Sequence, residues 1–211
     1  MYQNQILALL GHNGAGKTTT ISIINGILKE TSGQVSVQGL DVLKQRDSAQ
    51  KIIGICPQDD VLLFGMTVQE NLDFFCGIRM MSQDQIKEFS STMLRNFSLE
   101  SKKDSLVKTL SGGQKRKLQL IISLCGETKI LLLDEPSSGM DPTARRDTWE
   151  FLKREKKDRI IILTTHYMDE ADELGDRIAI MSKGKLKCCG SSQFLKKRYG
   201  LGLIIEIVQI Q

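Results

Sequence analysis

Two kinds of hydrophobic pattern alternate along the chain, and together they predict its fold class. Short apolar runs at residues 6–10, 130–133 and 160–164 have the length and composition of buried strands. Longer segments with apolar residues at helical spacing separate these runs. Strands that alternate with helices predict an α/β protein, with a mostly parallel sheet that is covered by helices on both faces.

The predicted elements leave an uninterrupted helical stretch in the middle of the chain. The predicted strands are residues 6–10, 34–37, 51–56, 130–133, 160–164, 177–182 and 203–210. The predicted helices are residues 18–28, 67–79, 83–96, 113–125, 142–157, 168–174 and 191–199. Because no convincing strand occurs between residues 61 and 126, we expect an inserted helical subdomain at about residues 60–126. The sheet core is then expected at about residues 1–59 and 127–211.

Composition is compatible with one sizeable core and excludes global disorder. The chain has 211 residues, of which 40% are hydrophobic and 26% are charged. Its net charge of +4 is dispersed and too small to indicate nucleic acid as a partner. We interpret the basic clusters at residues 115–117, 153–159 and 196–198 as solvated helix faces. Anionic lipid heads are an alternative contact for the last of them.

Cysteine spacing and hydropathy indicate a domain from a reducing compartment. The five cysteines lack C-x-x-C spacing and a histidine at ligand spacing, so we expect packed thiols and no metal other than Mg²⁺. They are Cys56, Cys76, Cys125, Cys188 and Cys189. The first residues carry no signal-peptide pattern, and no apolar run approaches the roughly 20 residues that span a bilayer. If the protein serves a membrane, its spanning part is expected outside this sequence.

The first chemical motif is a glycine loop at residues 11–18, directly after the first predicted strand. It fits G-x-x-x-x-G-K-[ST] at every fixed position. Its glycines let backbone N–H groups surround the β- and γ-phosphates of a nucleotide, at the start of the following helix. Lys17 adds a positive charge, and Thr18 adds a hydroxyl ligand for Mg²⁺. A merely flexible turn of glycine and asparagine would not need the Lys-Thr pair.

The second motif is a pair of carboxylates, Asp134 and Glu135, at the end of an apolar run. A central strand would hold both acids at its carboxyl end, beside the glycine loop. There Asp134 would belong to the Mg²⁺ shell, and Glu135 would orient and polarise the attacking water as general base. An Asp-Glu pair at a strand end is weak by itself, and the upstream glycine loop makes it specific.

A third motif, the LSGGQ segment at residues 110–114, opens a predicted helix. Ser111 suits the N-cap, and the glycines leave backbone N–H groups bare. Taken alone, the segment is explained equally well by an ordinary cap and turn. The segment lies between the glycine loop and the pair Asp134 and Glu135. With this combination and spacing of three motifs, the chain resembles the ATP-binding cassette (ABC) family. The resemblance covers essentially the whole chain, with the motifs in the family's order.

This resemblance implies a P-loop NTPase fold: a RecA-like core with a mostly parallel sheet, an inserted α-helical subdomain and antiparallel C-terminal strands. It implies ATP and Mg²⁺ as ligands, and two cassettes that sandwich the nucleotides head to tail. In the family the LSGGQ segment contacts the γ-phosphate held by the partner cassette, which implies that role for Ser111, Gly113 and Gln114. The loop at residues 138–141 matches the family's crossing between cassettes, with Asp141 as its most telling residue.

Two single residues match the family further. Gln58 matches a glutamine that reaches Mg²⁺ and links to the helical subdomain, and His166 matches a histidine that contacts the γ-phosphate and the partner. His12 lies at a variable loop position and is not expected to be catalytic. The residues expected to contact ATP are Gly11, Asn13, Gly14, Ala15, Gly16, Lys17, Thr18, Thr19, Ser111, Gly112, Gly113, Gln114 and Asp141. The expected catalytic residues are Glu135, His166 and Gln58, and the expected Mg²⁺ ligands are Thr18, Gln58 and Asp134.

The C-terminal third, residues 163–200, together with residues 64–67, resembles the A subfamily of eukaryotic ABC transporters, most of which move lipids or sterols. This implies an ATP-hydrolysing motor domain on the cytoplasmic face of a membrane, which contacts transmembrane domains through residues 59–75. The family's N-terminal antiparallel strands, which carry an adenine-stacking aromatic residue, have no match here. Tyr2 is too close to Lys17 for that role. We therefore expect a single nucleotide-binding domain, residues 1–211, without those strands.

Two other functions stay open from the sequence. A soluble ABC ATPase outside transport, such as the translation-factor branch, would share every motif, although its usual second cassette and basic linker are not visible here. A nucleotide-binding module with little turnover would follow if the missing strands weaken adenine binding. A P-loop kinase is disfavoured because the LSGGQ segment would have no role in it.

Overall fold

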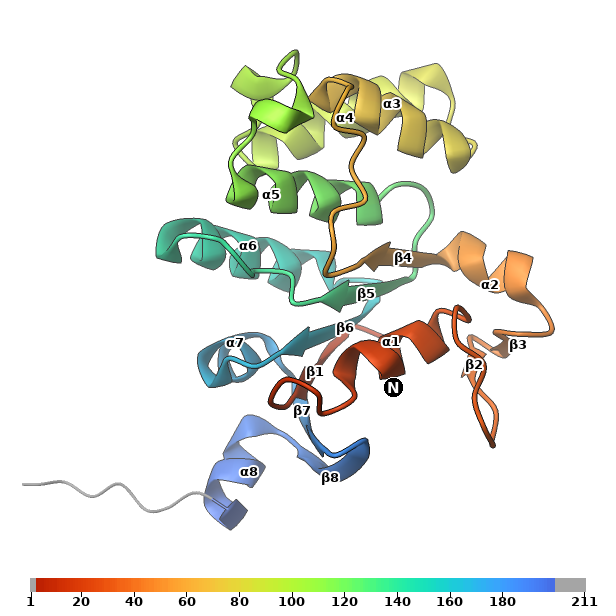
Figure 1. Cartoon of the computed structure of the whole chain (residues 1–211), viewed down its shortest axis with the longest axis vertical. Coiled ribbons are helices and arrows are strands. Elements are labelled where there is room, and N and C mark those ends of the chain that lie inside the picture. The colour runs from red at the N-terminus through yellow and green to blue at the C-terminus, as the bar shows by residue number, and fades with distance from the viewer. Residues whose placement is uncertain (1–2, 200–211) are drawn as a thin grey trace, which may run out of the picture.

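A six-stranded sheet forms the centre of the molecule, with the strand order β4-β5-β6-β1-β7-β8 (Figure 1). The computed structural model describes residues 3–199. The strands are β4 (Ile53–Cys56), β5 (Ile130–Asp134), β6 (Ile160–Thr165), β1 (Gln5–Leu10), β7 (Arg177–Ser182) and β8 (Lys185–Gly190). Neighbouring strands are parallel except β8, which pairs antiparallel with β7. The predicted α/β class with a mostly parallel sheet is confirmed.

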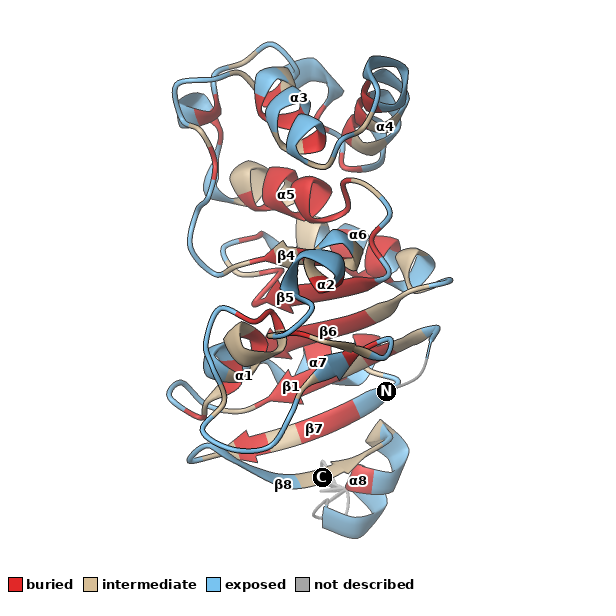
Figure 2. Ribbon diagram, turned by 90° about the vertical axis from the view of Figure 1, so that its right-hand side faces the viewer, coloured by how far each residue is buried: buried red, intermediate tan, exposed pale blue. Residues whose placement is uncertain are grey.

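The uniform apolar character of the central strands reflects burial on both faces. In β5, Leu131 and Leu133 belong to one core cluster, whereas Ile130 and Leu132 belong to the other, because successive side chains point to opposite faces. One face is covered by α1 (Lys17–Ile24), α2 (Arg46–Ile52) and the small hairpin of β2 (Ser36–Val37) and β3 (Leu40–Asp41). The other is covered by α5 (Gly112–Ser123), α6 (Pro142–Glu155) and α7 (Met168–Leu174). Figure 2 shows the buried strands between these layers.

Three helices lie together at one end of the molecule, beyond β4 (Figures 1 and 2). They are α3 (Val68–Ile78), α4 (Gln83–Asn96) and α5, with the short 3₁₀ turns η1 (Glu100–Lys102) and η2 (Val107–Thr109) between them. Each helix begins with a capping box, in which Thr67, Ser82 or Ser111 is the N-cap residue. Such boxes satisfy backbone N–H groups at a helix start, and they explain why the predicted starts of these helices lie within one residue of the observed ones.

Gly54 sets how closely β4 and α5 approach each other. A Cβ atom at this position would lie 1.9 Å from the carbonyl oxygen of Ser123 and 2.8 Å from the side chain of Leu131. Only a residue without a side chain therefore lets the end of α5 rest directly on β4.

The structure corrects several predicted boundaries. Residues 51 and 52, predicted as the start of a strand, end the helix α2, which the sequence did not predict. The helix predicted at residues 18–28 ends at Ile24, because Asn25 is its C-cap and Gly26 adopts a φ of 71°. Strand β8 was not predicted at its observed position, and the strand predicted at residues 203–210 lies outside the described residues. No helix among residues 3–199 has the length and apolarity of a membrane span.

Candidate functional site

Three of the predicted site segments lie at one edge of the sheet. Strands β1, β5 and β6 are parallel neighbours, with Leu10 paired to Thr165 and Asp134 paired to Thr164. The glycine loop follows β1, Glu135 follows β5 and His166 follows β6. The structure therefore brings these segments together at the carboxyl end of the sheet, where open α/β sheets bind ligands.

The glycine loop turns tightly and ends in an open helix N-terminus. A Cβ on Gly11 would lie 2.7 Å from the carbonyl oxygen of Met181, so the loop requires glycine there. Gly14 and Gly16 adopt φ values of 77° and 99°, which favour glycine. Gly16 is the N-cap of α1 and offers no side chain to its first N–H groups. These donors, together with the helix dipole, fit a phosphate group.

Lys17 is held inside the loop. Its side chain is buried, and its Nζ atom donates hydrogen bonds to the carbonyl oxygens of Gly11 at 2.7 Å and His12 at 3.2 Å. Neither partner is a carboxylate, so the positive charge is not neutralised by an ion pair within residues 3–199. Ala15 is buried beside it, whereas Asn13, Thr18 and Thr19 are exposed. The loop therefore offers an anion both a cation and several uncapped backbone donors.

The two carboxylates after β5 have different surroundings. Asp134 is buried and accepts a hydrogen bond from the hydroxyl of Thr164. The backbone N–H of Glu135 donates to the Oγ1 atom of the same threonine at 3.0 Å. The Glu135 carboxylate turns to His166, with 3.0 Å between Oε1 and Nδ1. One threonine thus fixes the backbone after β5 so that the two acids point to different partners.

Glu135 also adopts an unusual backbone conformation, with a φ of 51°. This left-handed region is unfavourable for residues with a side chain, and such strain concentrates at functional sites. Its neighbour His166 is supported by Tyr167, with 4.0 Å between the ring centroids, and the Arg145 guanidinium lies 4.7 Å from the centroid of the Tyr167 ring. Tyr167 and Arg145 therefore support the histidine side of the Glu135–His166 pair.

Oxygen donors for a divalent cation are present at this edge. Thr18, Gln58 and Asp134 offer a hydroxyl, an amide and a carboxylate, which are the hard ligands that Mg²⁺ takes when substrate phosphates complete its shell. Within residues 3–199 no group of three or more His, Cys, Asp or Glu side chains converges on a metal site. By the chemistry of their oxygen atoms, Thr18, Gln58 and Asp134 fit Mg²⁺ held jointly with a phosphate.

The LSGGQ segment lies elsewhere. The Ser111 Oγ atom accepts from the Gln114 N–H at 3.2 Å, and the Gln114 Oε1 atom accepts from the Ser111 N–H at 3.0 Å. Gly112 has open space around it, and Gly113 lies beside Gly139 and Met140. The structure therefore places the LSGGQ segment beside residues 139–140 and shows no hydrogen bond from it to the glycine loop within residues 3–199.

Asp141 occupies the start of another helix. Its Oδ1 atom accepts hydrogen bonds from the N–H groups of Thr143 and Ala144, at 3.0 Å each, as the N-cap of α6. The hydrogen bond from Ala144, followed by that from Thr143, holds the pKa of Asp141 below its ordinary value. Asp141 thus lies in the same loop as Gly139 and Met140, beside the LSGGQ segment.

One residue of the site was missed from the sequence. Arg116 lies in a basic cluster that we interpreted as a solvated helix face, and this is wrong for Arg116, which is buried. Its guanidinium donates to the carbonyl oxygens of Pro57 and Glu135. The available signal was its position one helical turn before the buried Leu120.

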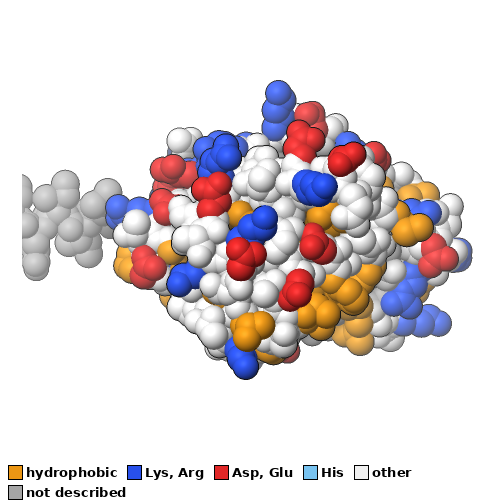
Figure 3. Space-filling view, turned by 90° about the horizontal axis from the view of Figure 1, so that it is seen from above, with side chains coloured by type: hydrophobic (Ala, Val, Ile, Leu, Met, Phe, Trp, Pro, Cys, Tyr) orange, Lys and Arg blue, Asp and Glu red, His pale blue; other side chains and the backbone are white. Residues whose placement is uncertain are grey.

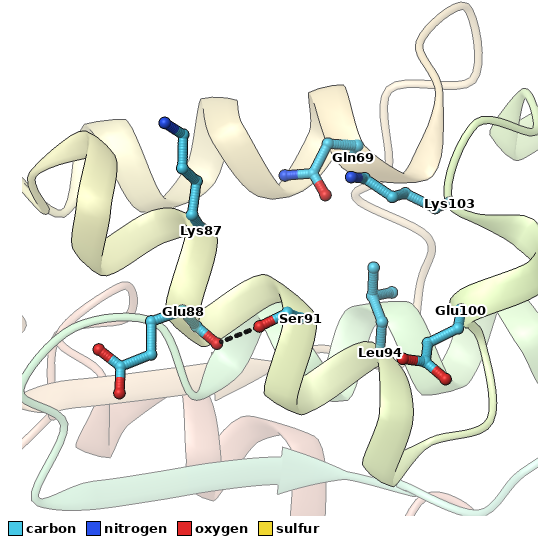
Figure 4. A pocket seen from close by; sticks show the side chains of 7 residues that line it. All are labelled: Gln69, Lys87, Glu88, Ser91, Leu94, Glu100 and Lys103. Atoms are coloured by element: carbon cyan, nitrogen blue, oxygen red, sulfur yellow. Dashed lines mark hydrogen bonds between the residues drawn. The ribbon is translucent and has the colours of Figure 1, made fainter.

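A separate hollow of about 650 Å³ lies between α3 and α4 (Figure 4). Its walls mix lysine, glutamate and neutral side chains, and none belongs to the glycine loop. The lining residues are Gln69, Lys87, Glu88, Ser91, Leu94, Glu100 and Lys103. The candidate site is therefore defined by the edge of the sheet and not by this hollow.

Comparison with known protein families matches residues 1–138 to the family described as "ABC transporter". Over 209 residues, the chain is 49% identical to the phospholipid-transporting ATPase ABCA3 of Rattus norvegicus. Over the same length it is 48% identical to ATP-binding cassette sub-family A member 2 of Homo sapiens. These alignments cover 99% of this chain but only 12% and 9% of the two relatives. The chain therefore spans about a tenth of the length of the relatives it matches.

Solved structures show the same fold. The structure of an ATP binding subunit of an ABC transporter has a TM-score of 0.85 at 27% identity and covers 94% of this chain and 83% of that one. The structure of cbiO1 from Clostridium perfringens, part of the ABC transporter complex cbiONQ, has a TM-score of 0.83 at 28% identity and covers 95% and 82%. A dimeric post-hydrolysis structure of the ATP-binding cassette MJ0796, bound to ADP and Pi, has a TM-score of 0.82 at 23% identity and covers 90% and 87%.

Proposed function

The chain belongs to the ABC transporter family and carries an ABC ATPase domain, and from this premise we propose that it is the motor domain of a lipid transporter. The observation that carries the proposal is the shared sheet edge, where an uncapped helix N-terminus and a buried lysine adjoin two acids of different surroundings. Binding and hydrolysis of ATP at this edge would drive the movement of attached membrane helices.

The glycine loop would hold the β- and γ-phosphates. Backbone N–H groups after Gly16 supply directed donors, and the dipole of α1 favours the negative charge. The Lys17 ammonium would exchange its hydrogen bonds to loop carbonyls for charge-assisted hydrogen bonds to phosphate oxygens, which are stronger. Binding therefore needs a small movement of one side chain within a preformed loop.

Mg²⁺ would be held by Thr18, Gln58 and Asp134. When bound, the cation neutralises charge on the phosphate oxygens during transfer. Asp134 is suited to this role because the Thr164 hydroxyl occupies one carboxylate oxygen and leaves the other for a ligand. Gln58 is exposed after β4, so its amide can reach the same edge from the neighbouring strand.

Glu135 would act as general base toward the attacking water. Its carboxylate lies at the carboxyl end of β5 and is held by His166, so its position is defined before substrate arrives. His166 is partly exposed and can contact the γ-phosphate on its other side. A positioned base of this kind contributes typically about 100- to 10,000-fold to a rate.

The partner is proposed to be a second cassette in a head-to-tail pair. The LSGGQ segment lies at the N-terminus of α5 and includes Ser111, Gly112, Gly113 and Gln114. Within residues 3–199 it has no hydrogen bond to the glycine loop of its own chain. Such a segment can complete the nucleotide site of another cassette instead. Asp141, in the loop beside it, would lie at the same junction.

Transmembrane domains are proposed to dock on α3 and the segment before it, residues 59–75. Val61, Phe64 and Phe74 are exposed there, although Leu62 is buried in the core. Figure 3, which views the helical end of the molecule, shows hydrophobic side chains gathered along one side of this face. Apolar groups collected on a surface are typical of an interaction site. A location on the cytoplasmic face of a membrane would follow from this contact.

The proposal that the transported molecule is a lipid rests on the names of the relatives. The ABCA3 and ABCA4 proteins are described as phospholipid-transporting ATPases and are 49% and 45% identical to this chain. A soluble ATPase outside transport is the competing function, and co-fractionation of the native protein with membranes distinguishes the two.

The deciding experiment is light scattering of the Glu135→Gln variant with and without Mg-ATP. A rise from monomer to dimer mass that requires nucleotide supports the motor function. A mass that stays monomeric, while bound ATP is detected, contradicts a pair of identical cassettes. Turnover by the unmodified chain, measured in parallel, separates an active motor domain from a nucleotide-binding module with little turnover.

A further inference from the structure

Arg116 joins two strand ends that both belong to the candidate site. Its Nη1 atom donates to the carbonyl oxygen of Pro57 at 2.5 Å, directly after β4. Its Nη2 atom donates to the carbonyl oxygens of Asp134 and Glu135, the latter at 3.0 Å. A single side chain of α5 therefore holds the backbone that carries Gln58 and the backbone that carries the two acids.

A second side chain of α5 extends this contact. Gln119, one turn after Arg116, accepts from Nη1 of Arg116 at 2.9 Å and donates to the carbonyl oxygen of Asp59 at 2.8 Å. Both residues are buried. Every acceptor of the guanidinium in this contact is a carbonyl or amide oxygen, and the planar fork of donors fixes their spacing in a way that a lysine cannot.

Helix α5 also carries the LSGGQ segment at its start. Ser111 is the N-cap, and Arg116 lies little more than one helical turn further along. A rigid helix transmits a displacement of its first turn to a residue at this distance. Contact with the LSGGQ segment is thus mechanically connected, through Arg116, to the backbone of Glu135.

We propose that Arg116 is a positioning residue that couples the LSGGQ segment to Gln58 and Glu135 of the same chain. The inference rests on the proposed function, in which the LSGGQ segment completes the nucleotide site of a second cassette. In a head-to-tail pair, Arg116 then links the site that its own Glu135 serves to the site that its own Ser111 completes. Binding of nucleotide at one site therefore changes the position of residues at the other through the Arg116 guanidinium.

The strained backbone of Glu135 makes this link sensitive. Its φ of 51° is unfavourable and persists only when the surroundings enforce it. Arg116 supplies part of that enforcement through the Glu135 carbonyl oxygen. Loss of the guanidinium fork lets this peptide relax and moves the carboxylate, whereas the glycine loop, on β1, keeps its own contacts.

The test compares Arg116→Lys and Arg116→Ala with a matched control, Arg46→Ala. Arg46 is an exposed arginine of α2, on the opposite face of the sheet, and its side chain forms no hydrogen bond or ion pair with another described residue. For each protein, kcat and KM for ATP, the Kd of a fluorescent ATP analogue and the midpoint of thermal unfolding are measured.

We expect kcat of Arg116→Lys to fall by about 10- to 100-fold, the effect of a misplacement of about 1 Å. The Kd of the analogue and the melting midpoint should stay close to those of the unmodified chain, and Arg46→Ala should match it throughout. Full activity of Arg116→Lys would overturn the proposal, since charge alone would then suffice. A parallel loss of nucleotide affinity would do the same, because it would indicate a general structural role.

Hydrogen exchange gives a readout that a merely structural role would not move. In the unmodified chain, Mg-ATP should change exchange at residues 111–114 and 135–138 together, and in Arg116→Ala only at the first of these segments. Equal responses of both segments in Arg116→Ala would refute the coupling. An unmodified chain that neither hydrolyses ATP nor dimerises would instead refute the proposed function, so the two failures are distinguishable.

Discussion

Two helices of this chain start at glycine-containing segments, yet their N-termini differ in how they are capped. Helix α1 follows Gly16, which offers no side chain to the first N–H groups. Helix α5 follows Ser111, whose hydroxyl and the side chain of Gln114 close a reciprocal capping box. The first end is open toward the acids at the sheet edge, and the second is partly satisfied by its own side chains.

This difference explains how one chain can hold half of each of two sites. The open end can accept a phosphate once the Lys17 ammonium leaves the loop carbonyls of Gly11 and His12. At the start of α5 the capping box already uses the N–H groups of Ser111 and Gln114, so fewer backbone donors remain for a phosphate, and we expect binding there to be weak by itself. We expect the α5 end to engage only when a second cassette already presents a bound nucleotide.

The largest effect is expected at the open site, from Glu135→Gln. Because the amide cannot accept a proton from water, kcat should fall by about 100- to 10,000-fold, while ATP still binds. Steady-state turnover and equilibrium binding of radiolabelled ATP measure the two quantities. Substantial residual turnover would show that another group serves as base.

Lys17→Ala should weaken ATP binding itself. Loss of hydrogen bonds from a charged group to phosphate should raise the Kd for ATP by about 10- to 100-fold. The matched control is Lys29→Ala, which removes an exposed lysine that follows the same helix and should leave the Kd unchanged. Isothermal titration of both variants gives the comparison, and equal affinities would contradict the assigned role of the loop.

Ser111→Ala tests the closed end against an equivalent cap. Ser82 forms the same capping box at the start of α4, so either substitution to alanine should lower the free energy of unfolding by about 1 kcal/mol. Only Ser111→Ala, in the Glu135→Gln background, should also raise the dissociation constant of the nucleotide-bound dimer, by about 10-fold. Urea unfolding and sedimentation equilibrium measure the two effects. Equal dimerisation of both variants would remove the LSGGQ segment from the interface.

A third helix start, at Asp141, gives the smallest expected effect. Hydrogen bonds from Ala144 and then Thr143 lower its folded pKa, so its charge stabilises the folded chain above the unfolded pKa of about 3.9. That contribution is lost as the pH falls through the folded value. Asp141→Asn keeps a neutral cap, so the variant should be less stable than the unmodified chain at pH 7, and the difference should shrink below about pH 4. Urea unfolding at several pH values tests this, and a constant difference would contradict it.

The sequence predicted the elements whose ends carry their own chemical signals. Helix α4 occupies residues 83–96, as predicted, because Ser82 and Gln85 cap its start. The strand before Asp134 was visible because burial on both faces demands a continuous apolar run. Helix α2 was missed because only Ala49 of its seven residues is buried, so its hydrophobic pattern is too short to detect.

At the candidate site, motif spacing predicted which segments share the sheet edge, but not how they are held there. The left-handed backbone of Glu135 depends on two residues distant in sequence: its N–H donates to the Thr164 hydroxyl, and its carbonyl oxygen accepts from Arg116. A charged residue is solvated by default, so burial of Arg116 could be inferred only from its helical position. These contacts depend on tertiary packing, which local patterns do not encode.

The direct approach of β4 to α5 at Gly54 has a consequence for inherited variation. Any replacement there, alanine included, would force the helix off the strand by adding atoms within 1.9 Å of the Ser123 carbonyl oxygen, and overpacking of this kind costs about 1–3 kcal/mol or more. In a cell, such an allele would lower the amount of the protein, because quality control degrades a poorly folded chain. Molecules that escaped degradation would still have all the residues that are proposed to bind the nucleotide. Such an allele is therefore a candidate for rescue by a compound that assists folding, whereas an allele at Glu135 is not.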